Sequence, residues 1–227
     1  MESKSVWPRE LSGPVSWESK PSDLAKLTAA AAPVINRVVT KPVFDAARDK
    51  VDVLTIGIDL FSGQDRNHIE LVAVFDMRAA KLVRWTGKSY PTSDQEKWLV
   101  QVVNLDTHLL SIAGERVLVL GCHDLNMYNP RGRENQNPGG SRRERCDEMR
   151  AKVKKFQPSV VLHHPHSTDT PNIWNTAWNS LRGKIPNVKA WASGICYYNY
   201  RNEAPRASLE RVLKSTQGGA PCLDIKC

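Results

Sequence analysis

The chain has 227 residues, with 32 basic and 24 acidic side chains and a formal net charge of +8. Hydrophobic residues make up 41% and charged residues 25%, the balance of a globular protein, which excludes a wholly disordered chain. No apolar run approaches the roughly 18 residues needed to span a bilayer, so we expect no membrane segment.

The first 50 residues are expected to form an N-terminal arm with short helices, followed by a single α/β domain over residues 51–227. Prolines and glycines interrupt residues 1–21, and Ser22 can cap a helix over residues 23–32. Pro33 is expected to end that helix, since proline cannot donate the helical hydrogen bond.

Three strands should come next, over residues 51–61, 69–75 and 81–85, with connections short enough for antiparallel pairing. Ser93 and Glu96 have the spacing of a capping box. Apolar residues then recur at near-helical spacing, which predicts a helix that reaches residue 110.

Beyond this point strands and helices are predicted to alternate. Strands are expected over 116–121, 159–162 and 188–197. Helices are expected over 141–156, opened by a second capping box at Ser141 and Glu144, from Pro171 onward, and over 208–216. This alternation is typical of parallel βαβ units.

The fold class is therefore α/β, with a mixed sheet of about six strands. It starts with three antiparallel strands, continues with βαβ alternation, and carries helices on both faces. This element order resembles the ribonuclease-H-like fold, or a Rossmann-like fold, over about residues 51–216. In ribonuclease-H-like enzymes, aspartates on the first strand and after the fourth hold divalent ions, and Asp59 and Asp124 match those places by order.

Polar residues gather where two predicted strands end. His123 and Asp124 follow the first strand, and His163, His164 and His166 follow the second. Open α/β sheets bind ligands outside the carboxyl ends of their strands, so we expect one shared crevice. The alternative is that His163 is a buried residue at a strand end and that Asp169 caps the following helix.

Imidazole and carboxylate groups suit a divalent metal ion, either Zn²⁺ or Mn²⁺/Mg²⁺. They suit metal-free acid–base catalysis equally well. The predicted catalytic residues are His123, Asp124, His164 and His166, and the predicted metal ligands are Asp59, Asp124, His164, His166 and Asp169.

A fragment of the sequence also resembles calcineurin-like metallophosphoesterases. Residues 121–124, Gly-Cys-His-Asp, are similar to the G-N-H-D motif of that family, and residues 163–165, His-His-Pro, are similar to its later histidine motif. The opening D-x-H and the closing G-H-x-H motifs are absent from the chain.

The positive charge is concentrated in the second half of the chain. Residues 1–115 hold 14 basic and 15 acidic side chains, whereas residues 116–227 hold 18 and 9. Arg131, Arg133 and Asn126 lie in a polar segment between the two clusters, and arginine binds phosphate bidentately. An anionic ligand, either a nucleotide or a nucleic acid, is the expected partner.

These features predict a metal-dependent hydrolase that acts on a phosphoester of a nucleotide or nucleic acid. The first alternative is a non-catalytic sensor or assembly subunit that binds the same ligands. The second is a hydrolase with a Cys–His pair that uses Cys122.

A cytoplasmic location is also expected. The N-terminus lacks the basic-then-apolar order of a signal peptide, and the five cysteines include no CxxC pair. Reduced thiols are the simplest interpretation of that pattern.

Overall fold

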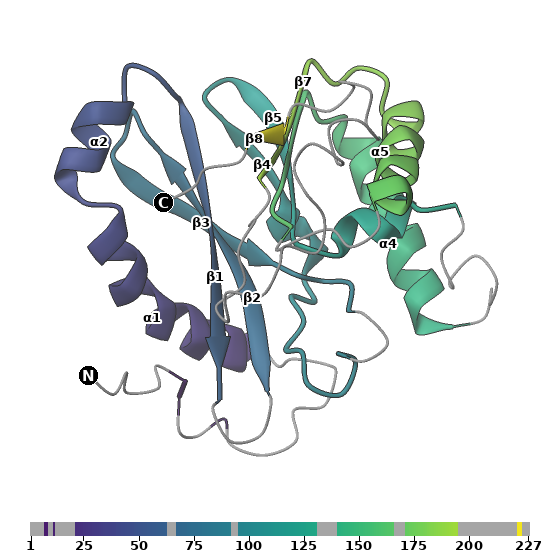
Figure 1. Cartoon of the computed structure of the whole chain (residues 1–227), viewed down its shortest axis with the longest axis horizontal. Coiled ribbons are helices and arrows are strands. Elements are labelled where there is room, and N and C mark those ends of the chain that lie inside the picture. Colours follow the sequence, from purple (N-terminus) through teal and green to yellow (C-terminus); the bar gives the residue numbers. More distant parts are fainter. Residues whose placement is uncertain are drawn as a thin grey trace. The chain divides into compact units, whose positions relative to one another are not determined.

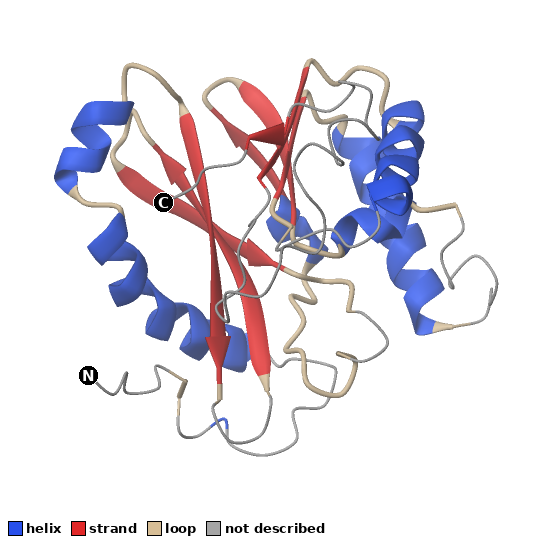
Figure 2. Ribbon diagram, viewed as in Figure 1, coloured by secondary structure: helices blue, strands red, loops and turns tan. Residues whose placement is uncertain are grey.

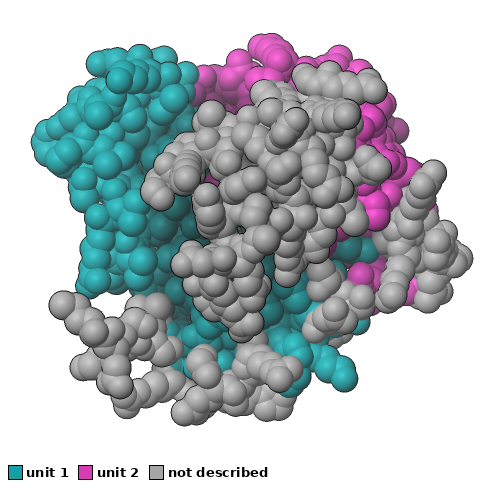
Figure 3. Space-filling view, in the orientation of Figure 1, with its two compact units in different colours: residues 1–107 teal, residues 108–227 magenta. Residues whose placement is uncertain are grey.

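The structure is a computed structural model of the chain. It describes residues 7–8, 11, 21–62, 67–91, 95–130, 140–165, 171–194 and 222–223. The chain divides into two compact units, residues 1–107 (unit 1) and residues 108–227 (unit 2) (Figure 3). The helices expected in a separate arm belong to unit 1, together with the first three strands.

The described part of unit 1 contains two α-helices and a three-stranded antiparallel sheet in the order β1-β2-β3. The predicted antiparallel start is therefore confirmed. Figure 1 shows both helices on the same side of β1. The elements are α1 (Pro21–Val38), α2 (Lys41–Ala47), β1 (Val53–Phe61), β2 (His68–Asp76) and β3 (Lys81–Gly87).

Helix α1 continues through Pro33, so the predicted end of the helix at this residue is wrong. Leu27, Ala31 and Ile35, spaced four residues apart, are all buried on one face of the helix. This face packs among apolar residues of the sheet. Burial of the apolar face offsets the hydrogen bond that Pro33 cannot donate.

The helix predicted to reach residue 110 is wrong. Residues 95–98 form turns, Leu99 makes a parallel bridge with His68, and only residues 105–108 form a short 3-10 helix. The amide nitrogens of Val100 and Val102 donate to the backbone oxygens of His68 and Lys88. The β-branched residues of this segment are therefore extended alongside β2 and β3, and the apolar spacing reflects burial without a helix.

Unit 2 holds a five-stranded sheet in the order β4-β5-β6-β7-β8. β4 is antiparallel to β5, and the later pairs are parallel, as the predicted βαβ alternation requires. The strands are β4 (Leu109–Ile112), β5 (Glu115–Leu120), β6 (Val160–His163), β7 (Ala190–Gly194) and β8 (Cys222–Leu223). The helices are η3 (Asp124–Tyr128), α4 (Ser141–Phe156) and α5 (Pro171–Lys184).

The hairpin between β4 and β5 turns on Ala113 and Gly114, whose φ angles of 52° and 78° are both left-handed. Two residues with positive φ form the turn that matches the twist of an antiparallel pair. This turn places β5 between β4 and β6 in the sheet.

The α/β class is confirmed, but the strands divide between two sheets instead of forming one. β5, β6 and β7 are neighbours in chain order, so right-handed crossovers place α4 and α5 on the same face of the sheet (Figure 2). Gly140 is the N-cap of α4 and no side chain caps the helix, so the capping box predicted at Ser141 is wrong. The helix predicted over 208–216 lies outside the described residues.

In the part of the chain that the structure describes, no helix is both long and apolar enough to cross a membrane.

Candidate functional site at the ends of β5 and β6

The two predicted clusters meet at the carboxyl ends of β5 and β6. Leu120 is paired with His163 in the parallel ladder, and the backbone nitrogen of His164 donates to the oxygen of Leu120 at 2.9 Å. The His163 ring lies 3.0 Å, measured from Nε2, from the backbone oxygen of Cys122. Two segments that are 41 residues apart in sequence are thus joined directly, as the alternation of strands and helices predicted.

His163 is buried and faces the protein interior, with 1% of its surface exposed. Burial lowers the pKa of this imidazole to about 3; the bond to the Cys122 carbonyl opposes that shift, and positive charge on His164 or His123 would add to it. The ring is therefore neutral at physiological pH. The bond from His163 to the Cys122 carbonyl places this ring beside the residue that precedes His123.

A buried carboxylate closes the turn after β5. Asp124 is fully buried, and its Oδ2 atom accepts a hydrogen bond from the backbone nitrogen of Gly121 at 2.8 Å. In return, the backbone nitrogen of Asp124 donates to the Gly121 oxygen at 3.2 Å. His108, also fully buried, has its Nδ1 atom 3.9 Å from Asp124 Oδ2. The same nitrogen donates to the Val119 oxygen at 2.6 Å. These contacts make Asp124 an anchor of the turn.

His123 and His164 are the partly exposed imidazoles of the cluster. His123 precedes η3, and its backbone oxygen accepts from Asn126 at 2.9 Å. Its Nδ1 atom is buried and has no hydrogen-bond partner within the described segments. An imidazole nitrogen without a partner is able to accept a proton or to bind a metal ion.

Several predicted site residues lie outside the described part of the chain. They are His166, Asp169, Arg131 and Arg133. Asn126 is partly buried in η3. Among residues that are described, no three His, Cys, Asp or Glu side chains come together to hold a metal ion.

Asp59 belongs to unit 1, where it is exposed on β1 opposite Glu70. β1 and β5 lie in different sheets. The pairing of Asp59 with Asp124 across one sheet, which the ribonuclease-H-like order implied, is therefore absent. Asp59 as a metal ligand stays a prediction.

The Cys122 side chain is partly exposed and is not in a disulfide within the described residues. His163, the nearest imidazole along the sheet, has both ring nitrogens within hydrogen-bond distance of other groups, the Cys122 oxygen and Ser193 Oγ. Because both ring nitrogens of His163 already have partners, His164 and His166 remain the candidate bases for a Cys–His pair.

Sequence reasoning missed His108 and Ser193. The predicted helix included His108, and that helix does not form. Nothing in the sequence therefore indicated that His108 lies beside Asp124. Ser193 lies inside the strand predicted over residues 188–197, and a single serine within a strand carries no signal by itself. The parallel register, which places it opposite His163, is the missing information.

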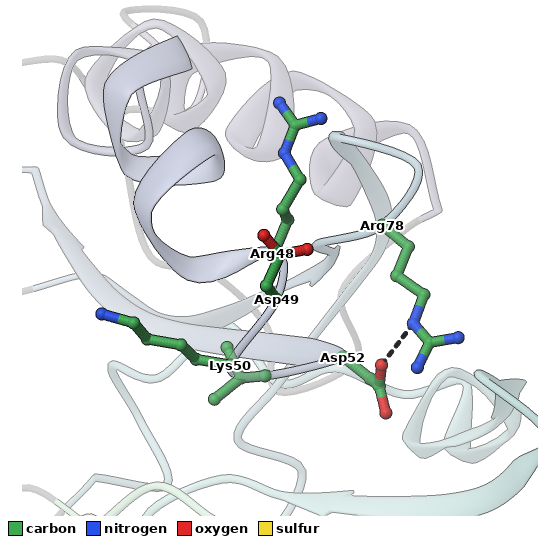
Figure 4. A pocket seen from close by; sticks show the side chains of 6 residues that line it. Arg48, Asp49, Lys50, Asp52 and Arg78 are labelled. Carbon is green, nitrogen blue, oxygen red and sulfur yellow. Dashed lines mark hydrogen bonds and ion pairs between the residues drawn. The ribbon is translucent and has the colours of Figure 1, made fainter.

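A separate pocket in unit 1 is lined by charged residues at the junction of α2 and β1 and in the turn after β2 (Figure 4). Its charges largely neutralise one another: Arg78 donates to Asp52 at 2.5 Å, and Arg48 is paired with Asp45. These side chains are well exposed, so water and salt screen them. The pocket is a weaker candidate than the strand ends of unit 2.

The residues predicted for the unit 2 cluster differ in how far they are buried. Asp124 and His163 are buried and bound to the backbone, His123 and His164 are partly exposed, and the remaining predicted groups lie outside the described residues.

Comparisons with protein-family models, with curated proteins and with solved structures found no match to this chain.

Proposed function

We propose that the carboxyl edge of the unit 2 sheet hydrolyses a phosphoester of a nucleotide or nucleic acid with the help of a divalent metal ion. The observation that carries this proposal is the meeting of the segments that hold His123, His163 and His164 at the ends of β5 and β6, where His123 Nδ1 has no hydrogen-bond partner among the described residues. Parallel sheets bind ligands at this edge.

The candidate metal ligands are His123 and His164, together with His166 and Asp169. A bound ion would polarise a phosphoryl oxygen and lower the pKa of a coordinated water. Asp124 has a different role in this proposal, because its carboxylate is buried and bonded to Gly121. It would hold the turn that presents His123.

The charge of the chain supports an anionic substrate. Residues 116–227 hold 18 basic and 9 acidic side chains, an excess of nine positive charges. Arg131, Arg133 and Asn126 are the proposed contacts to the phosphate, since charged donors bind phosphate oxygens strongly. Cys122 and Cys146 are not in disulfides within the described residues, which is compatible with the proposed cytoplasmic location.

The test uses the purified full chain. Transition-metal content is measured by mass spectrometry, and hydrolysis of bis(p-nitrophenyl) phosphate and of single-stranded oligonucleotides is measured with and without a chelator. We expect His123→Ala and His164→Ala each to lower kcat/KM by about 100-fold or more, as loss of a metal ligand does.

Ser111→Ala is the matched control, because Ser111 is exposed on β4 and is paired with Arg116 near the start of β5, away from the carboxyl end of that strand. Activity that survives both histidine substitutions and the chelator would overturn the proposal.

A sensor or assembly subunit that binds nucleotide or nucleic acid is the second candidate. It is favoured by the burial of Asp124 and His163, whose contacts serve the backbone. Oligonucleotide binding that is unchanged by chelation, without turnover, would support this candidate.

A further inference from the structure

A line of hydrogen bonds crosses three parallel strands beneath the proposed site. Ser193 Oγ of β7 lies 3.0 Å from His163 Nδ1, and His163 Nε2 of β6 lies 3.0 Å from the Cys122 oxygen that follows β5. Ser193 and His163 are each 1% exposed. The last acceptor of this line, Cys122, directly precedes His123 in the sequence.

The proton positions follow from the chemistry of the two ends. A carbonyl oxygen can only accept, so His163 Nε2 carries the proton and donates it to Cys122. A neutral imidazole then has Nδ1 as an acceptor, and Ser193 donates its hydroxyl hydrogen to that nitrogen. One tautomer of His163 satisfies both contacts.

Aromatic packing holds the ring in this plane. The Trp178 ring meets the His163 ring edge to face, with centroids 5.7 Å apart, and Trp174 lies 6.3 Å away. Trp178 is itself 5.5 Å from Trp191 on β7. In a packed interior, a half-turn of the imidazole would break both hydrogen bonds and disturb these contacts.

We propose that Ser193 and His163 are positioning residues that fix the Cys122 carbonyl and thereby the placement of the His123 imidazole. The inference rests on the proposed function of the same edge and adds two residues to it. Partners that orient a ligand-bearing group in this way often matter nearly as much as the group itself.

The test compares two substitutions of His163 that reproduce different nitrogens. The amide nitrogen of His163→Gln can occupy the place of Nε2 and donate to Cys122. His163→Asn reaches only as far as Nδ1, so it can contact Ser193 but not Cys122. Both substitutions remove the ring.

We expect kcat in His163→Asn to fall about tenfold below that in His163→Gln, with KM similar in the two. In spectra of protein with carbon-13-labelled histidine, the His123 ring signal should shift in His163→Asn, and amide exchange over residues 121–124 should accelerate. Equal kcat values and an unshifted His123 signal would overturn the positioning role.

Ser193→Ala is the second variant, for the case in which a histidine variant fails to fold. It removes only the donor to Nδ1, so faster exchange at residues 121–124 is expected, and unchanged exchange would refute the inference. If the wild-type protein shows no hydrolysis, the proposed function fails, but the His123 signal and the exchange rates still decide the positioning role.

Discussion

At the scale of single residues, His163 shows how burial turns a titratable side chain into a neutral structural group. Its ring donates to a backbone oxygen, lies against two tryptophans, and has a pKa lowered to about 3 by burial. A histidine in water has a pKa near 6.5. The unfolded chain therefore binds a proton at mildly acidic pH that the folded chain does not.

This difference predicts a pH-dependent stability. The stabilising contribution of His163 is complete above about pH 6.5 and is lost as the pH falls toward 3, by about 1.4 kcal/mol per pH unit. Between pH 7 and pH 5, the free energy of unfolding of the wild type should therefore fall by about 2 kcal/mol more than that of His163→Gln. Urea unfolding at the two pH values measures both, and parallel pH dependences would contradict the prediction.

The site was predictable from sequence at this scale only in part. Histidines and aspartates after two apolar strands located the cluster, because strand ends in parallel sheets are neighbours. Burial was not predictable, since His163 and His164 are adjacent in sequence and point to different environments. The exchange of hydrogen bonds between Gly121 and Asp124 likewise depends on a turn geometry that composition does not reveal.

At the scale of elements, a buried ion pair joins Glu70 of β2 to Lys88, the residue that follows β3. Lys88, 1% exposed, donates to Glu70 at 2.9 Å and to Gln95 at 2.6 Å. Because the Gln95 oxygen accepts from Lys88, its amide nitrogen faces Glu70 and His68, at 3.2 Å and 3.4 Å. Gly87 permits the close approach of the two backbones beside this pair, since a Cβ atom there would lie 2.3 Å from the backbone oxygen of Glu70.

Removal of one partner of this pair should be costly. We expect Lys88→Met to lower the free energy of unfolding by about 3–5 kcal/mol, because it leaves the Glu70 charge buried without its ammonium partner. The double substitution Glu70→Leu with Lys88→Met should recover most of that loss. Urea unfolding of the single and double variants measures the coupling, and additive losses would show that the two charges are independent.

The elements themselves were predicted well where short apolar runs end at clear turns, and poorly where apolar residues recur three or four apart. The five predicted strands over residues 51–85, 116–121 and 159–162 form, since their periodicity and turns agree. The segment from Leu99 to Leu110 failed because apolar residues spaced three or four apart also occur in buried extended chain. Contacts of this segment with β2 and β3 decided its conformation, and such contacts are not local.

At the scale of the whole molecule, the positive charge is distributed unevenly along the chain. The excess of basic side chains lies in residues 116–227, which belong to unit 2 and hold the proposed site. The class of the fold followed from element order, but the division into two sheets did not. An antiparallel start followed by βαβ units fits one mixed sheet or two separate ones, and strand pairing at long range distinguishes them.

The uneven charge leads to a prediction about binding. If unit 2 contacts nucleic acid, affinity for a single-stranded oligonucleotide should fall steeply between 50 and 200 mM salt, with a slope of about −0.7 for each phosphate contacted. Lys155→Glu, an exposed substitution on α4 of unit 2, should weaken binding and make the slope shallower. Fluorescence anisotropy with a labelled oligonucleotide at several salt concentrations measures both quantities.

Lys41→Glu is the matched control, because it makes the same change of charge at an exposed position on α2 of unit 1. Long-range attraction to the net charge of the chain would weaken equally in both variants, whereas contact with unit 2 weakens in only one. Equal effects of the two substitutions would therefore show that the oligonucleotide does not contact unit 2 at α4. A lower slope for Lys155→Glu alone would identify α4 as part of the surface that the phosphates approach.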